Sequence, residues 1–181
     1  MKVYNYKDAY PHLQYVLKTG KEDAFIAIIT DTVVHFGEEG GFNPDVAEAL
    51  NIPYYNIHKK GGAMVTSPGD IVYCFTSKKD NLIFNAKLCD FLSKKLSHKQ
   101  IPITKEKNDL LADGRKFLGY MQKNLPHISY YGGHISINCN LPLIQQICTK
   151  TMQKVPCGLG EFGITTEEVI KWIQEFYFYF K

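Results

Sequence analysis

Long apolar runs are missing from this sequence of 181 residues, and none approaches the roughly 20 residues that a membrane-spanning helix needs. The first residues, "MKVYNYKDAYPHLQ", lack the apolar region of a signal peptide, which argues against secretion. Internal repeats and low-complexity tracts are also missing, which excludes a repeat architecture. We therefore expect a cytoplasmic protein without a membrane partner.

A strong charge of either sign is missing as well. The 21 lysines and arginines nearly balance the 18 aspartates and glutamates, and the net charge is +3. Nucleic-acid-binding proteins normally gather basic residues on one face, whereas the lysines of this chain are scattered. We therefore expect no nucleic-acid partner.

Closely paired cysteines are missing, although the chain has five cysteines: Cys74, Cys89, Cys139, Cys148 and Cys157. No two of them form a CxxC pair, so no metal site is expected. An odd number of cysteines without a signal peptide favours reduced thiols. Most buried cysteines are inert core residues, so a catalytic role needs further support.

A hydrophobic core is well supplied by this composition. Hydrophobic residues make up 45% of the chain and charged residues 22%, as in ordinary globular proteins. The length fits one domain, residues 1–181. Helical and strand patterns follow one another without a regular βαβ alternation, which indicates an α+β fold.

Three local signals mark the ends of the expected elements. A helix that begins near residue 6 should stop at Gly20. A hairpin should turn at Asp113–Gly114. The last helix should begin with a capping box, in which Thr165 and Glu168 exchange hydrogen bonds.

Cys157 lies in the stretch "KVPCGLG", residues 154–160. Pro156 stiffens the approach and Gly158 leaves the far side open, so this turn is a place where an exposed thiol could attack an acyl group. A thiolate needs a nearby cation or base, and Lys154 is the only local one. The alternative is a small buried thiol beside a loop.

Lys116 lies in "DGRKFLG", residues 113–119, just after the expected hairpin turn. Its neighbours Phe117 and Leu118 are apolar, and a partly desolvated lysine is suited to proton transfer. The alternative is a lysine on the solvent face of the hairpin.

A glycine-bearing stretch, "KKGGAMVTSPGD", occupies residues 59–70. Paired glycines allow a backbone to approach a ligand closely, and Thr66 and Ser67 are possible donors. The spacing is not that of a nucleotide P-loop, and a plain hairpin loop is the alternative. His58 and His134 stand beside glycines, where each is a candidate catalyst or an ordinary satisfied polar residue.

The order of these segments resembles one known superfamily. Over about residues 5–170, the chain resembles lipoate–protein ligases, biotin–protein ligases and octanoyltransferases. The segments that carry the resemblance are, in order, "NIPYYNIHKKGGAMVTSPGDIVY", "NDLLADGRKFLG", "GGHISINCN" and "VPCGLGEFGITTEE". The resemblance implies a single α+β domain in which helices flank a central mixed β-sheet. It also implies that an acyl chain lies in a tunnel between the glycine loop and the sheet.

The resemblance assigns roles to particular residues. Cys157 and Lys116 are expected to meet in space as a catalytic pair, with the thiolate taking the acyl group and the lysine assisting the proton transfers. The residues expected to bind the acyl group or substrate are Lys60, Gly61, Gly62, Ala63, Thr66, Gly119, Gly133, His134 and Gly158.

Three functions are open at this point. The first is an acyltransferase that moves an octanoyl or lipoyl group from acyl carrier protein to a lysine of a lipoyl carrier domain, with no cofactor. The second is a lipoate or biotin ligase that uses ATP and Mg²⁺, with Lys59, Lys60 and Arg115 available for the phosphates and Cys157 incidental. The third is a non-catalytic relative that binds an acyl ligand or a carrier domain.

Overall fold

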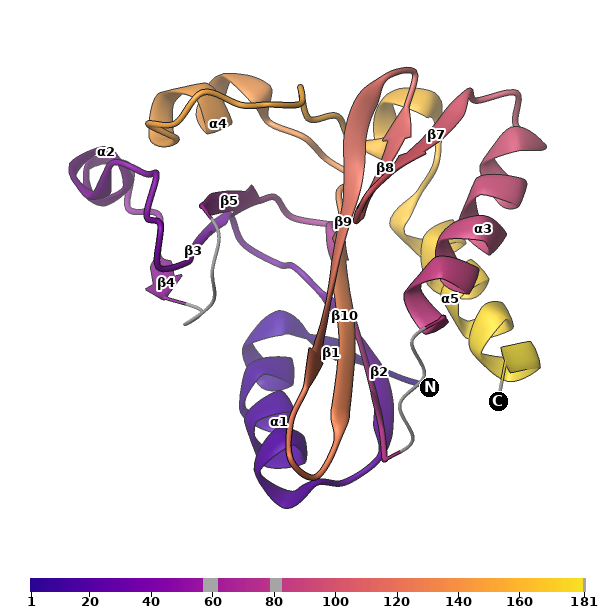
Figure 1. Cartoon of the computed structure of the whole chain (residues 1–181). Helices are drawn as coiled ribbons and strands as arrows, with labels where there is room; N and C mark the ends of the chain where they lie inside the picture. The colour runs from indigo at the N-terminus through magenta and orange to yellow at the C-terminus, as the bar shows by residue number, and fades with distance from the viewer. Residues whose placement is uncertain (57–61, 79–82, 181) are drawn as a thin grey trace.

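Seven strands form the central sheet of the computed structural model, which describes residues 1–56, 62–78 and 83–180 (Figure 1). In the order β1-β2-β6-β10-β9-β8-β7, the sheet is built from β1 (Lys2–Asn5), β2 (Asp23–Ile28), β6 (Ile71–Ser77), β10 (Ser129–Ile135), β9 (Arg115–Asn124), β8 (Asp109–Ala112) and β7 (Ile103–Glu106). β1 runs parallel to β2 and the other neighbours are antiparallel. The expected central mixed sheet is confirmed.

A smaller sheet of three strands lies beside the central one. β3 (Val33–Phe36) pairs in parallel with β4 (Tyr54–Asn56) and antiparallel with β5 (Ala63–Thr66). Its apolar residues Val34 and Val65 pack with Ile147 in a core separate from that of the central sheet. The segments on either side of Thr30–Asp31 form β2 and β3, which belong to different sheets.

Helices α1 (Tyr6–Thr19), α3 (Phe84–Ser97) and α5 (Thr166–Phe180) cover the two faces of the central sheet. Helices α2 (Pro44–Ala49) and α4 (Leu141–Ile147) pack with the small sheet, and a 3₁₀ turn lies at Leu159–Phe162. Side chains of successive strand residues point to opposite faces, so Ile26 and Tyr131 pack with α3 and α5, whereas Phe25 and Tyr130 pack with α1. Figure 1 shows α1 on the opposite side of the sheet from α3 and α5.

The three local signals of the sequence are confirmed. Gly20 ends α1 in the left-handed conformation, at a φ of 63°. The turn between β8 and β9 has positive φ at both Asp113 and Gly114, as a two-residue type I′ hairpin requires. At the start of α5, Thr165 N donates to Glu168 and Glu168 N donates to the Thr165 hydroxyl.

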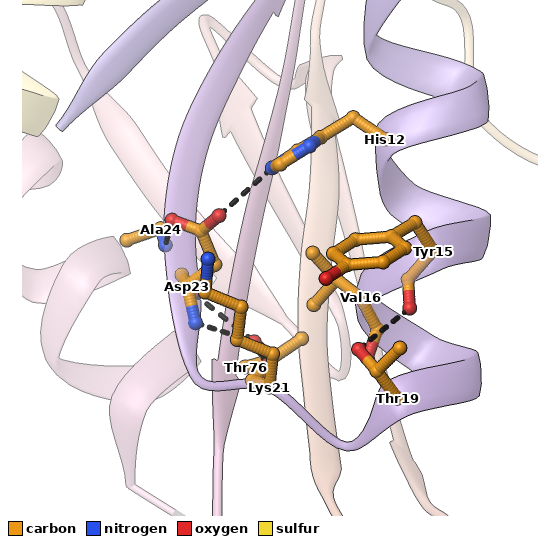
Figure 2. Close-up of polar contacts among 8 residues, drawn as sticks. All are labelled: His12, Tyr15, Val16, Thr19, Lys21, Asp23, Ala24 and Thr76. Carbon is orange, nitrogen blue, oxygen red and sulfur yellow. Dashed lines mark hydrogen bonds and ion pairs between the residues drawn. The ribbon is translucent and has the colours of Figure 1, made fainter.

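Polar contacts fix α1 to the sheet, as Figure 2 shows. His12 Nε2 lies 2.8 Å from Asp23 Oδ2 at the start of β2. The backbone N–H of Asp23 donates to the Thr76 hydroxyl on β6. The His12 ring also packs edge-on against Phe25, with ring centroids 5.2 Å apart. The helix and strands β2 and β6 are therefore tied together at one end of the sheet.

Candidate active site

Three positions align across strands β8, β9 and β10. Asp109 is the register partner of Gly119, and Gly119 is the register partner of His134. Direct register partners share a face of the sheet. Gly119 has no side chain, and the amine of Lys116 uses this space: Lys116 Cε and Nζ lie 3.2 Å from the place where a Gly119 Cβ would be. The row therefore places a carboxylate, an ammonium group and an imidazole together.

A β-bulge brings Lys116 to this face. The register of β8 on β9 shifts between Leu110 and Leu111, so Phe117 is an extra residue on β9. Bulges of this kind redirect side chains and are frequent beside active sites. Residues three positions apart on a regular strand lie on opposite faces. Because of the bulge, the Lys116 side chain lies on the same face of the sheet as position 119.

Asp109 is shared by two lysines. Its Oδ1 lies 2.9 Å from Lys116 Nζ and its Oδ2 lies 2.8 Å from Lys154 Nζ. Lys154 also contacts Glu106 at 3.0 Å. Burial by itself would raise the pKa of Asp109, but hydrogen bonds from Lys154 and Lys116 lower it below its ordinary value. Asp109 is therefore a carboxylate that holds Lys116 as a cation.

A cavity of about 470 Å³ opens in front of this row. One wall is strand β5 of the small sheet with the residue before it. The second is the surface of β9 and β10, and the third comes from α4 and the segment that follows it. Its lining includes Gly62, Ala63, Met64, Val65, Lys116, Phe117, Gly119, His134, Ser136, Cys139, Ile144, Cys148, Lys150, Lys154 and Pro156. Five of the expected site residues, namely Lys116, Gly62, Ala63, Gly119 and His134, are thus brought to one cavity.

Cys157 differs from the expectation of an exposed thiol. Its side chain is fully buried in the main core, and Sγ donates to the backbone oxygen of Arg115 at 3.4 Å. Burial raises the pKa of the thiol to about 11, so it stays protonated at neutral pH. The expectation of exposure is wrong because the turn packs its small side chain inward.

The predicted meeting of Cys157 and Lys116 occurs through their backbones. The N–H of Cys157 donates to the Lys116 oxygen at 2.9 Å, and the N–H of Lys116 donates to Val155. Lys116 then extends into the cavity, whereas Cys157 turns into the core. The nucleophilic role of Cys157 stays a prediction.

Three other expected site residues serve packing in this structure. Thr66 is fully buried and its hydroxyl donates to the Val33 oxygen. A Cβ on Gly133 would lie 2.5 Å from the Tyr73 hydroxyl oxygen. A Cβ on Gly158 would lie 2.2 Å from the Ile137 oxygen. As far as residues 1–56, 62–78 and 83–180 define the cavity, none of the three lines it. Lys60 and Gly61, together with His58 and Lys59, lie outside the described residues.

Gly158→Ala is expected to lower the free energy of unfolding by roughly 3 kcal/mol, because a methyl group at 2.2 Å from a backbone oxygen forces two backbones apart. Urea unfolding measures the change. Gly62→Ala is the matched control, since among the described residues its Cβ meets nothing closer than 3.7 Å. Equal stability of the two variants would contradict this packing role.

The structure adds a buried residue that the sequence pattern did not single out. Asp70 is 1% exposed, and its Oδ2 lies 3.0 Å from His134 Nε2. Asp109 and Lys154 were also not expected beside Lys116. Cys139 lines the cavity as well, but burial raises the pKa of its thiol to about 11. Asp70 could have been noticed in the sequence because it is an acidic residue directly before a strongly apolar strand segment, which begins at Ile71.

Residues 1–56, 62–78 and 83–180 contain no group of three His, Cys, Asp or Glu side chains placed to hold a metal ion. In the same ranges, no helix has both the length and the apolar character to cross a membrane.

Comparison with known families gives a match over most of the chain. Residues 13–170 match the family described as "Lipoyl protein ligase A/B catalytic domain". No curated protein sequence matches the chain. The superfamily expected from the sequence segments is confirmed.

Solved structures with the same fold include three whose descriptions name lipoate or a lipoate protein ligase. LipL1 of P. falciparum in complex with lipoate is 15% identical with a TM-score of 0.79, and all of this chain aligns with 63% of that one. A bi-partite lipoate protein ligase from Thermoplasma acidophilum, described with its E2 lipoyl domain, is 10% identical with a TM-score of 0.77, over 97% of this chain and 81% of that one. Lipoate-protein ligase A bound with ATP is 11% identical with a TM-score of 0.79, over 98% and 81%.

Proposed function

Because the chain belongs to the lipoyl protein ligase A/B catalytic domain family, we propose that it joins lipoate, or a similar medium-chain acid, to a lysine of a lipoyl carrier domain through an acyl-adenylate. Residues 1–181 act as one catalytic domain in this proposal. The observation that carries it is the contrast between Lys116, whose amine lines the cavity, and Cys157, whose thiol is buried away from it.

The charges around the cavity suit a phosphate-bearing substrate. Lys116, Lys150 and Lys154 all line it, and lysine is a common point-charge partner of phosphate groups. Mg²⁺ would enter with ATP, because in such sites it is bound mainly by phosphate oxygens and waters. ATP, lipoate and an E2 lipoyl domain are named for solved structures of the same fold, and these names supply the substrates of the proposal.

The chemistry has two steps. The carboxylate of the acid attacks the α-phosphate of ATP, pyrophosphate leaves, and an acyl-adenylate forms. The amine of the carrier lysine then attacks the acyl carbon, the carbon–oxygen bond breaks, and AMP leaves as an amide forms. The ammonium of Lys116, fixed by Asp109, stabilises the negative charge of the phosphate in the first step and the charge that develops on the acyl oxygen in the second.

Exchange of labelled pyrophosphate into ATP in the presence of lipoate tests the proposal. We expect exchange by the purified protein, and an unchanged rate for Cys157→Ala within about twofold, because the thiol takes no part. Intact mass after incubation with an octanoyl thioester should show no adduct at neutral pH, since the pKa of Cys157 is raised to about 11. No exchange with any acid, together with an adduct on Cys157, would overturn the adenylate route.

The second candidate is thioester transfer from acyl carrier protein through Cys157. One contact favours it: the backbone N–H of Cys157 donates to the oxygen of Lys116 at 2.9 Å, and both Lys116 and Pro156, the residue before Cys157, line the cavity. The same mass experiment would then show an octanoyl adduct that Cys157→Ala loses. A non-catalytic relative would bind a lipoyl domain and give neither exchange nor adduct.

A further inference from the structure

We propose that His134, held by the buried Asp70, is the general base that accepts the proton from the carrier lysine when the amide forms. The inference rests on the proposed acyl transfer to lysine. The role of His134 is the same for an adenylate donor and for a thioester donor, because the amine of the carrier lysine attacks the acyl carbon in both cases.

The first support is the way in which Asp70 is fixed. Its Oδ1 accepts from the backbone N–H groups of Ile137 at 2.7 Å and Asn138 at 3.0 Å. Its Oδ2 accepts from the N–H of Ser67 at 2.9 Å. Four contacts, including the one to His134, hold a carboxyl group that is 1% exposed. Its orientation is therefore set by the backbone of two separate segments.

The second support is the tautomer that this arrangement selects. A carboxylate only accepts hydrogen bonds, so Nε2 of His134 carries the hydrogen in its contact with Asp70. In the neutral imidazole the other nitrogen, Nδ1, then has a free electron pair and can accept a proton. An imidazole oriented by a carboxylate on one nitrogen and used as a base at the other is a recurrent arrangement in enzymes.

The third support is the position of the ring. His134 lines the cavity and is directly opposite Gly119, over which the amine of Lys116 lies. Cross-strand partners have Cβ atoms about 5 Å apart, so the imidazole is a neighbour of the cation expected to polarise the acyl group.

Lys116 is poorly placed to be the base itself. Its ammonium contacts Asp109 Oδ1 at 2.9 Å, and an ammonium has no electron pair with which to accept a proton. Among the described residues, the other ionisable groups that contact His134, lie beside the row or line the cavity are Asp70, Asp109, Lys154, Lys150, Glu39 and the raised-pKa thiols of Cys139 and Cys148. Of these, Asp70 and Asp109 are already engaged by hydrogen bonds.

Amide formation moves one proton from the carrier lysine to His134. The carrier lysine enters as a neutral amine, and its nitrogen forms a bond to the acyl carbon. The bond between that carbon and the leaving oxygen of AMP breaks, and AMP takes the electron pair. The proton lost by the nitrogen moves to Nδ1 of His134, which becomes an imidazolium beside Asp70, and then passes to solvent.

The test separates the two half-reactions in His134→Gln and His134→Asn. General-base catalysis typically contributes 10²- to 10⁴-fold, so we expect single-turnover transfer from preformed lipoyl-adenylate to a lipoyl domain to fall by about 100-fold or more. Pyrophosphate exchange should stay within about threefold of the wild-type rate, since no amine is deprotonated in that step. His98→Gln, at an exposed position after α3, is the matched control and should leave both rates unchanged.

Hydroxylamine distinguishes a base from a structural residue. Its nitrogen is a much weaker base than that of lysine, so after attack it gives its proton to water without help, and both variants should form the hydroxamate at nearly the wild-type rate. Two outcomes would overturn the inference. One is transfer to the lipoyl domain at the wild-type rate in both variants. The other is a loss of hydroxamate formation and of pyrophosphate exchange as large as the loss of transfer to lysine. If the wild type shows no exchange at all, the adenylate route fails instead, and the same lysine and hydroxylamine comparison with an octanoyl thioester decides the role of His134.

Discussion

Lys116→Met is expected to lower the rate of lipoate transfer to a lipoyl domain by about 10³-fold, since removal of one fixed donor to a developing negative charge typically costs 10²- to 10³-fold. Lys116 is in addition the cation placed over Gly119 in the row of Asp109 and His134. Methionine keeps much of the apolar stem and removes the charge. Steady-state transfer, followed by the mass of the lipoyl domain, measures the effect.

Lys105→Met is the matched control for this experiment. Lys105 also contacts a carboxylate, that of Asp90 at 3.4 Å, but lies on β7 at the edge of the sheet, away from the cavity. Its activity should stay within about twofold of wild type, as for most surface substitutions. Transfer at the wild-type rate in Lys116→Met would contradict the site described above, whichever donor the enzyme uses.

Asp70→Ala is expected to give the largest loss of stability, about 4 kcal/mol in the free energy of unfolding. Three backbone N–H groups lose their acceptor, and each unsatisfied buried group costs about 1–3 kcal/mol before water relieves part of it. Urea unfolding measures the change. Asp70→Asn should be intermediate, because its one carbonyl oxygen can replace only one of the two carboxylate oxygens.

Asp90→Ala is the control for the buried aspartate, since the Asp90 side chain is 71% exposed. Its free energy of unfolding should change by less than about 0.5 kcal/mol. A loss in Asp70→Ala as small as this would show that the four contacts do not hold the turn before β6, and would remove the support for the orientation of His134.

Much of the fold could be predicted because local signals agreed with the final packing. Gly20 ends α1 since its left-handed φ suits glycine, and Thr165 and Glu168 form the capping box that starts α5. The hairpin at Asp113–Gly114 was readable from its turn residues. The strand β10, by contrast, is paired on both edges, by β6, which is distant in the sequence, and by β9, the preceding strand of a hairpin.

The arrangement of the site was less predictable because it depends on a one-residue shift. A regular hairpin through Asp113–Gly114 would pair Asp109 with Leu118, whereas the bulge at Phe117 pairs it with Gly119. Such a shift changes which side chains share a face. Nothing local in the sequence marks the bulge, so the contact between Lys116 and Asp109 came only from the structure.

The inward orientation of the Cys157 side chain was also unpredictable from local sequence. Proline and glycine indicated a turn, and the turn exists, but neither residue says which way the side chain between them points. The close approach of Gly158 to Ile137 presses this segment against the end of β10, and the thiol is directed into the core. Contacts between distant segments decided the outcome.

Two of the three walls of the cavity, β5 and the surface of β9 and β10, have separate hydrophobic supports. Val65 belongs to the small core with Val34 and Ile147, whereas Phe117 belongs to the core of the central sheet. Substitutions that reshape the wall at Ala63 and Met64 can therefore accumulate without loosening the strands that carry the ammonium and imidazole groups. The fold in this way lets the preference for one acid over another change during evolution while the reacting groups keep their places.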